Sequence, residues 1–101
     1  MSEPYSTSTQ QASSPMLQPH SREAEEAVVG SVLINPEAFY DVADFLRPED
    51  FYLHRLRFVW DAFIRLNEQR IPIDLLTVQE DLETHGQLAE IGGPAFLTTL
   101  V

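Results

Sequence analysis

An amphipathic stretch between two prolines, residues 54–68, constrains the fold most strongly. Apolar side chains recur there at the three- and four-residue spacing of an α-helix, and one face then carries Leu56, Val59, Trp60, Phe63 and Leu66. Pro48 before the stretch and Pro72 after it each disfavour a helical conformation in the preceding residue. The spacing therefore predicts one long helix over 54–68, against which shorter elements have to pack.

Two helices are expected before this stretch. Ser21 is a suitable N-cap for a helix over 22–34, where acids in the first turn interact favourably with the helix dipole. Asn35 caps a second helix whose first residue is Pro36. The run Ala27–Ile34 is apolar and rich in β-branched residues, which leaves a buried strand as an alternative. The acids before it lack the alternation of a strand, and this favours the helix.

Two more helices are expected after the stretch. Thr77 and Glu80 have the spacing of a capping box, Gly86 suits the left-handed residue that ends a helix, and Pro94 suits a first helical residue. The structural motif of this half of the chain comprises Pro72, Asp74, Thr77, Glu80, Gly86, Gly92, Gly93 and Pro94. The predicted fold class is all-α, a compact bundle of about five short helices with a disordered N-terminal tail.

Composition divides the chain into a tail and one domain. Residues 1–19 are rich in Ser, Thr, Gln and Pro with few large apolar side chains, so they are predicted to be disordered. They lack the basic start and apolar centre of a signal peptide, and no run approaches the roughly 18 apolar residues of a membrane span. Residues 20–101 are predicted to form a helical domain, truncated at its C-terminal end within the last helix. A cytoplasmic protein without membrane contact is expected.

Charge argues against one class of partner. The net charge is −10, and all six strong cations are arginines. A field of that sign repels a phosphate backbone, so direct DNA binding by this segment is not expected. Residues 21–44 and 74–90 each carry −5, whereas 47–70 carry +1. Asp81 and its acidic neighbours are expected to be solvated. The alternative for the arginine-rich middle helix is that it meets an acidic surface, in this chain or in another copy.

The residues that phosphate, metal or acid–base chemistry requires are absent or scattered. A phosphate-binding loop needs a lysine, which the chain lacks, and Pro94 after Gly92 and Gly93 has no N–H to offer an anion. The three histidines are far apart in sequence and there is no cysteine, which argues against a metal site. No catalytic, cofactor-binding or metal-binding residue is predicted.

One face of the middle helix is a candidate interface. Phe58, Ala62 and Arg65 lie off the core stripe and share a face at helical spacing. An exposed aromatic side chain in a small apolar patch is typical of a contact with a partner. The alternative is that a neighbouring helix, or the aromatic loop at 50–52, covers Phe58.

Four stretches, taken in order, resemble one protein family. They are 19–34 (PHSREAEEAVVGSVLI), 50–52 (DFY), 71–82 (IPIDLLTVQEDL) and 86–97 (GQLAEIGGPAFL). Together they are similar to the N-terminal domain of bacterial replicative DNA helicases of the DnaB type, and the similarity extends over residues 19–101. In that family a His usually occupies the position of Leu56 and a Gly that of Arg70. These departures affect local helix ends rather than the fold.

The resemblance implies a non-catalytic oligomerisation and partner-docking domain of a hexameric, ATP-dependent helicase that acts in DNA replication, in the primosome. It implies dimers and hexamers of the chain, contacts with primase and the helicase loader, and ATP and Mg²⁺ bound only in a separate RecA-like motor domain. The alternative is a stand-alone acidic helical adaptor that binds or regulates a replication protein.

Overall fold

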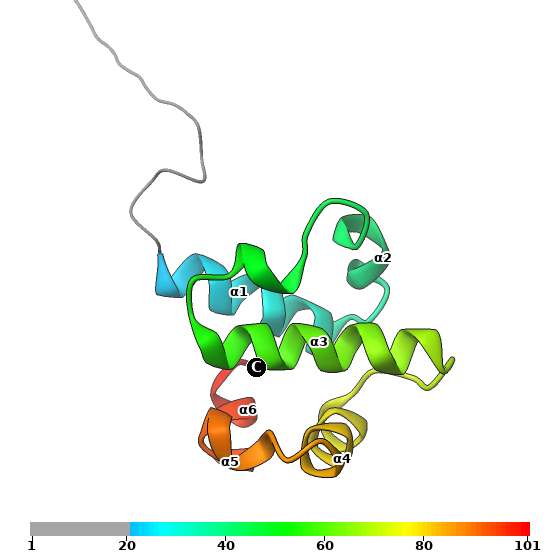
Figure 1. Ribbon diagram of the computed structural model, residues 1–101. Coiled ribbons are helices and arrows are strands. Elements are labelled where there is room, and N and C mark those ends of the chain that lie inside the picture. Colours follow the sequence, from blue (N-terminus) through cyan, green and yellow to red (C-terminus); the bar gives the residue numbers. More distant parts are fainter. Residues whose placement is uncertain (1–20) are drawn as a thin grey trace, which may run out of the picture.

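The long central helix organises the fold. The structure, a computed structural model, describes residues 21–101, so the predicted tail over 1–19 lies outside the described part. Figure 1 shows α3 (His54–Glu68) between two groups of helices: α1 (Arg22–Ile34) and α2 (Ala38–Val42) on one side, and α4 (Leu75–Thr84), α5 (Leu88–Ile91) and α6 (Pro94–Thr99) on the other. A short 3-10 helix, η2 (Pro48–Asp50), lies between α2 and α3. Residues 21–101 contain no strand, so the all-α prediction is confirmed.

The core lies along the inner face of α3, where all five side chains of the predicted stripe are buried. Trp60 is at its centre. Its ring lies between 5.2 and 5.4 Å from the rings of Phe39, Phe51 and Phe63. The indole N–H donates to the carbonyl oxygen of Leu46 at 3.1 Å, which satisfies the one polar group of this side chain. Trp60 therefore connects α3 to α2 and to the chain on both sides of η2.

A carboxylate of α1 fixes the start of α3. Glu25 accepts hydrogen bonds from the backbone N–H groups of Tyr52, at 3.0 Å, and Leu53, at 3.3 Å. Amides at the N-terminal end of a helix have no intrahelical acceptor, and the helix dipole favours negative charge there. Two of the stretches that resemble the helicase family, 19–34 and 50–52, are thus joined directly.

The end of the chain after α6 packs against α1. Gly30 is buried, and a side-chain carbon at this position would overlap the backbone carbonyl group of Leu100. The approach is possible because glycine has no Cβ. This contact brings the first and last helices of the bundle together.

The second helix is shorter than predicted. Residues 35–37 form a turn, so α2 begins at Ala38 rather than at Pro36. The N–H groups of residues 38–40 donate to carbonyls three residues earlier, which is the tighter pattern of a 3-10 turn. The buried side chain of α2 is Phe39.

The fourth helix begins earlier than predicted, because Asp74 and not Thr77 is its N-cap. The Asp74 carboxylate accepts from the Thr77 N–H at 2.9 Å, and the Thr77 hydroxyl accepts from the Asp74 N–H at 3.0 Å. This reciprocal pair satisfies two amides at once. The predicted capping box of Thr77 and Glu80 is wrong: Leu75 and Leu76 extend the helix back to Asp74, and Glu80 is an exposed residue within the helix.

The shortest α-helix, α5, has no counterpart among the predicted elements. It buries Ile91 completely, so tertiary packing holds four residues helical that would not be stable alone. Gly92 and Gly93 follow with φ of 102° and 79°, values that residues with a side chain rarely adopt. Gly93 is the N-cap of α6, and Pro94 is its first residue. The glycine pair therefore makes a tight connection between two helices.

The helices α3 and α4 end in the same way. After α4, Gly86 has a left-handed conformation, with φ 69°. After α3, the same position is held by Arg70, with φ 61°, and the N–H of Ile71 donates back to the carbonyl of Leu66 at 2.9 Å. The left-handed conformation costs a residue with a Cβ roughly 1–2 kcal/mol. Arg70 thus occupies a position that suits glycine.

Replacing Arg70 with glycine is expected to stabilise the domain by about 1 kcal/mol, because glycine adopts the left-handed conformation without strain. The measurement is the free energy of unfolding in urea. The matched control is Gln69→Gly, one residue earlier and in a right-handed conformation with φ −87°. That change is expected to destabilise. An Arg70→Gly protein no more stable than the original would contradict the assignment.

Candidate protein interface

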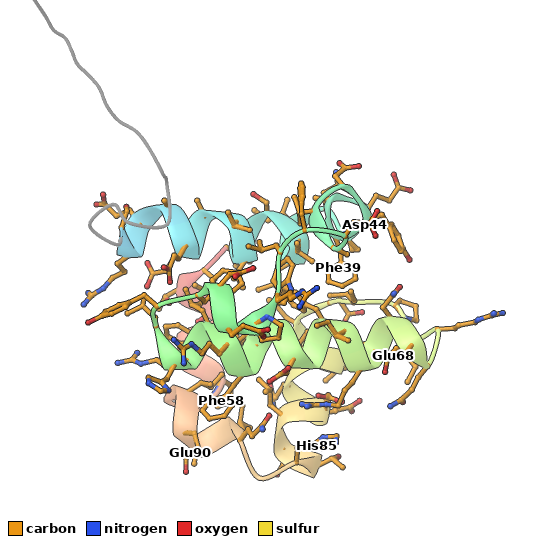
Figure 2. The ribbon with its side chains drawn as sticks, turned by 45° about the horizontal axis from the view of Figure 1, so that its top comes forward. Phe39, Asp44, Phe58, Glu68, His85 and Glu90 are labelled. Carbon is orange, nitrogen blue, oxygen red and sulfur yellow. The ribbon has the colours of Figure 1, made fainter. Side chains whose placement is uncertain are left out.

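The face of α3 predicted as an interface is covered. Ala62 is fully buried, Phe58 is half-buried against the core, and Arg65 is partly buried. Figure 2 shows Phe58 on the side of α3 that faces α5, and both α4 and α5 contact α3. The expected exposure is therefore wrong for Ala62, whereas Phe58 and Arg65 stay partly exposed, and a partner contact at this face remains a prediction. Neighbouring helices pack on them, which was the alternative.

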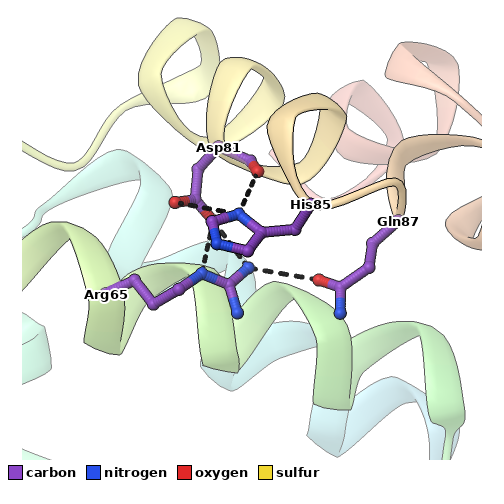
Figure 3. Close-up of polar contacts among 4 residues, drawn as sticks. All are labelled: Arg65, Asp81, His85 and Gln87. Carbon is purple, nitrogen blue, oxygen red and sulfur yellow. Dashed lines mark hydrogen bonds and ion pairs between the residues drawn. The ribbon is translucent and has the colours of Figure 1, made fainter.

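Arg65 holds α4 against α3. Its Nε and Nη2 atoms donate to Oδ2 of Asp81 at 3.0 and 2.7 Å, and Nη2 also donates to Oε1 of Gln87 at 3.1 Å (Figure 3). Nδ1 of His85 lies 2.9 Å from the backbone carbonyl oxygen of Asp81. The Asp81 side chain is only 6% exposed. The expectation that Asp81 is solvated is therefore wrong, and these charge-assisted bonds offset the cost of its burial.

The sequence did contain a signal for this ion pair. Asp81 follows Val78 by three residues and precedes Leu82, and both of these side chains are fully buried. Helical spacing places the acid at the edge of the same inner face. A carboxylate there needs a cation, because burying an unpaired charge is costly. The sequence left two possibilities for the arginines of the middle helix: exposure to solvent, or contact with an acidic surface. Arg65 follows the second, because it pairs with Asp81 of the same chain.

One carboxyl group on α3 has a shifted pKa. Burial raises the pKa of Asp61, the Arg65 guanidinium opposes this, and the Glu49 carboxylate adds to the rise. Because desolvation is the largest cause, the shift reflects packing, and among residues 21–101 no hydrogen-bonded acid–base partner accompanies it. Within residues 21–101, no three side chains of His, Cys, Asp or Glu are grouped so as to hold a metal ion.

Exposed apolar side chains gather around α2 instead. Ile34, Tyr40 and Phe45 are 70%, 63% and 64% exposed, and all three belong to the short segment 34–45. The other large exposed apolar residues of the described chain are spread over distant segments: Tyr52, Ile71, Leu76 and Val101. We call Ile34, Tyr40 and Phe45 the α2 corner. A local concentration of exposed apolar side chains is typical of a site of protein contact.

A groove borders the α2 corner. Its volume is about 560 Å³, and it lies between α2 and the segment 70–73 that follows α3. Tyr40 lines the groove on one side, and Ile71 and Pro72 line it on the other. Tyr40 therefore belongs both to the corner and to the groove. The positions predicted as an interface lie elsewhere, on the covered face of α3.

The fold and this surface define a class: a small all-helical domain whose internal ion pair and caps secure helix packing, and whose exposed apolar residues suit contact with another protein. No helix in the described part of the chain is long and apolar enough to cross a membrane. The chain belongs to the DnaB-like helicase N-terminal domain family, whose model matches residues 17–101.

Individual relatives agree with this assignment. The chain is 40% identical over 82 residues to the replicative DNA helicase DnaB of Geobacillus stearothermophilus, and 42% identical over 82 residues to that of Rhodothermus marinus. Each comparison covers 81% of this chain but only 18% and 9% of those relatives. The chain thus spans less than a fifth of the length of these curated relatives.

A solved structure shows the same fold. The crystal structure of the N-terminal domain of DnaB helicase from Mycobacterium tuberculosis matches with a TM-score of 0.78 and 39% identity, over 81% of this chain and 57% of that one. The resemblance inferred from the four sequence stretches is confirmed.

Proposed function

We propose that this chain is a non-catalytic oligomerisation and partner-docking domain of a hexameric, ATP-dependent replicative DNA helicase, and that it acts in the cytoplasm as part of the primosome. The observation that carries the proposal is the match of the whole described domain to the N-terminal domain of DnaB helicases. The proposed partners are other copies of the chain, as a dimer and within a hexamer, together with primase and the helicase loader. ATP and Mg²⁺ belong to a separate motor domain.

The way the chain uses its polar residues supports a role in protein contacts. Glu25 binds the amides at the start of α3, Asp74 caps α4, and Arg65 joins α3 to α4. These side chains maintain the fold, which leaves the exposed apolar residues of the α2 corner for contact with other proteins. The net charge of −10 disfavours a phosphate backbone as a direct ligand.

Self-association of the isolated chain is the first test. If dimerisation adds to stability, the melting temperature rises with protein concentration, because binding between folded chains shifts the unfolding equilibrium by mass action. Scanning calorimetry over a wide range of concentrations measures this, and sedimentation equilibrium gives the oligomeric state. A constant melting temperature together with monomeric sedimentation would contradict the oligomerisation part of the proposal.

The reading frame beyond Val101 is the second test. A continuing frame that encodes a GxxxxGK[ST] phosphate-binding motif supports the helicase. Removal of residues 21–101 from that gene product is then expected to weaken hexamer assembly, while ATP hydrolysis stimulated by single-stranded DNA remains. A frame that stops, with no such motif in an adjacent gene, would favour the acidic adaptor.

A further inference from the structure

The α2 corner is negatively charged as well as apolar. Glu37, Asp41 and Asp44 are exposed within the same segment, and Figure 2 shows Asp44 beside α2. In the described chain, none of these three carboxylates forms an ion pair. No arginine, lysine or histidine occurs between residues 23 and 46. A partner that covers the apolar side chains therefore meets three unneutralised carboxylates.

The groove gives this surface depth. Pro36 and Tyr40 line it from the α2 side, and Ile71 and Pro72 face them from the segment after α3. Large side chains of a partner gain burial there, and apolar area removed from water contributes roughly 25 cal/mol per Å². Arg70 also lines the groove, from the segment after α3, so the excess of negative charge belongs to the α2 segment. The surface thus combines apolar side chains with acidic ones.

A second copy of this chain is a poor occupant. Its one segment of positive net charge is 47–70, and three of the arginines there are already engaged. Arg55 lies over the ring of an α6 phenylalanine at 5.0 Å, Arg57 donates to a backbone carbonyl, and Arg65 pairs with Asp81. Segments 21–44 and 74–90 each carry −5 and would repel the carboxylates of the corner.

We propose that the α2 corner and its groove bind a basic amphipathic helix of a partner protein. The apolar face of that helix covers Ile34, Tyr40 and Phe45, and lysines or arginines along its flank meet the three carboxylates. This is the general manner in which helices bind grooves, with anchors spaced at three and four residues. The inference rests on the proposed partner-docking function, to which it adds the surface and the chemistry of the partner.

The test uses a synthetic peptide of leucine and lysine, patterned to form an amphipathic helix, and the 101-residue chain. Isothermal titration calorimetry measures its affinity for the original chain and for Tyr40→Ser and Phe45→Ser variants. Loss of a buried aromatic anchor is expected to weaken binding about tenfold or more. A peptide in which glutamate replaces lysine is expected not to bind, because the charges are then alike.

The matched control is Leu76→Ser, which removes another exposed apolar side chain, 62% exposed, from α4 in the acidic segment 74–90. This variant is expected to bind the basic peptide as the original chain does. Equal affinity of all the variants would mean general attraction to an acidic chain and would overturn the inference. Melting curves show that each variant is folded, and Phe45→Ser alone carries the test if Tyr40→Ser does not fold.

The same variants separate this inference from the proposed function. If the chain stays monomeric but binds the peptide through Tyr40 and Phe45, the docking surface is supported and the oligomerisation part of the proposed function is contradicted. If the chain self-associates but all variants bind the peptide equally, oligomerisation is supported and the docking surface is contradicted. If Tyr40→Ser and Phe45→Ser abolish self-association, the corner is an interface between copies, and the inference is overturned.

Discussion

Replacing Trp60 with alanine is expected to cost about 3–5 kcal/mol of folding free energy, the usual range for a buried tryptophan. Trp60 is fully buried and contacts three aromatic rings. A domain of this size has a total stability of roughly 4–12 kcal/mol at 0.05–0.15 kcal/mol per residue. The expected loss is therefore a large fraction of the total stability, roughly a quarter of it or more. Urea denaturation followed by far-ultraviolet circular dichroism measures the loss, since the single tryptophan is no longer present as a fluorophore.

The conservative variant Trp60→Phe separates packing from hydrogen bonding. It keeps a ring in the core but leaves the partly buried carbonyl of Leu46 without the indole donor, a loss of about 0.5–1.5 kcal/mol, the usual net contribution of a hydrogen bond. The expected order of stability is Trp, then Phe, then Ala. A Trp60→Ala protein as stable as the original would mean that the aromatic cluster is not the core of the fold.

The second large effect is expected for Gly30→Ala. An exposed helical glycine replaced by alanine gains roughly 1 kcal/mol from helix propensity. At Gly30 the new methyl group would overlap the backbone of Leu100, so α1 or the end of α6 has to move. Overpacking of a well-packed site costs typically about 1–3 kcal/mol, and here the opposing atoms belong to a backbone rather than to a flexible side chain. Net destabilisation is expected, and the sign of the change is the diagnostic result.

The neighbouring variant Ser31→Ala is the matched control. Ser31 is exposed on the same helix, and its hydroxyl donates to the carbonyl of Ala27. The expected change in unfolding free energy is within about 0.5 kcal/mol. If Gly30→Ala raised the stability by the full propensity gain, the close approach between α1 and the end of α6 would be refuted.

Elements in which spacing and caps agree were predictable from the sequence. The five apolar residues of α3 recur at helical spacing between two prolines, and all five are buried. Ser21 caps α1 as expected, with its hydroxyl accepting from the Ala24 N–H at 3.1 Å. In both cases the deciding interaction lies within a few residues along the chain.

The covered face of α3 was not predictable in the same way. Helical spacing shows that Phe58 and Ala62 lie off the main stripe, but not whether another element packs on them. The start of α4 was ambiguous for a different reason. Asp74 with Thr77, and Thr77 with Glu80, have the same capping spacing, so the local pattern does not choose between them. The α2 corner was missed because its exposure depends on how the turn at 35–37 and the short α2 are placed.

The contact between α1 and the end of α6 also determines when the domain is able to complete its fold during synthesis. Gly30 and Leu100 are 70 residues apart in the sequence. At a synthesis rate of about 5–20 residues per second, roughly 4–14 s pass between the synthesis of Gly30 and that of Leu100, which covers it. The nascent chain therefore passes through a stage in which the bundle is open along α1. At that stage the apolar side chains of α1 would be accessible to a ribosome-associated chaperone.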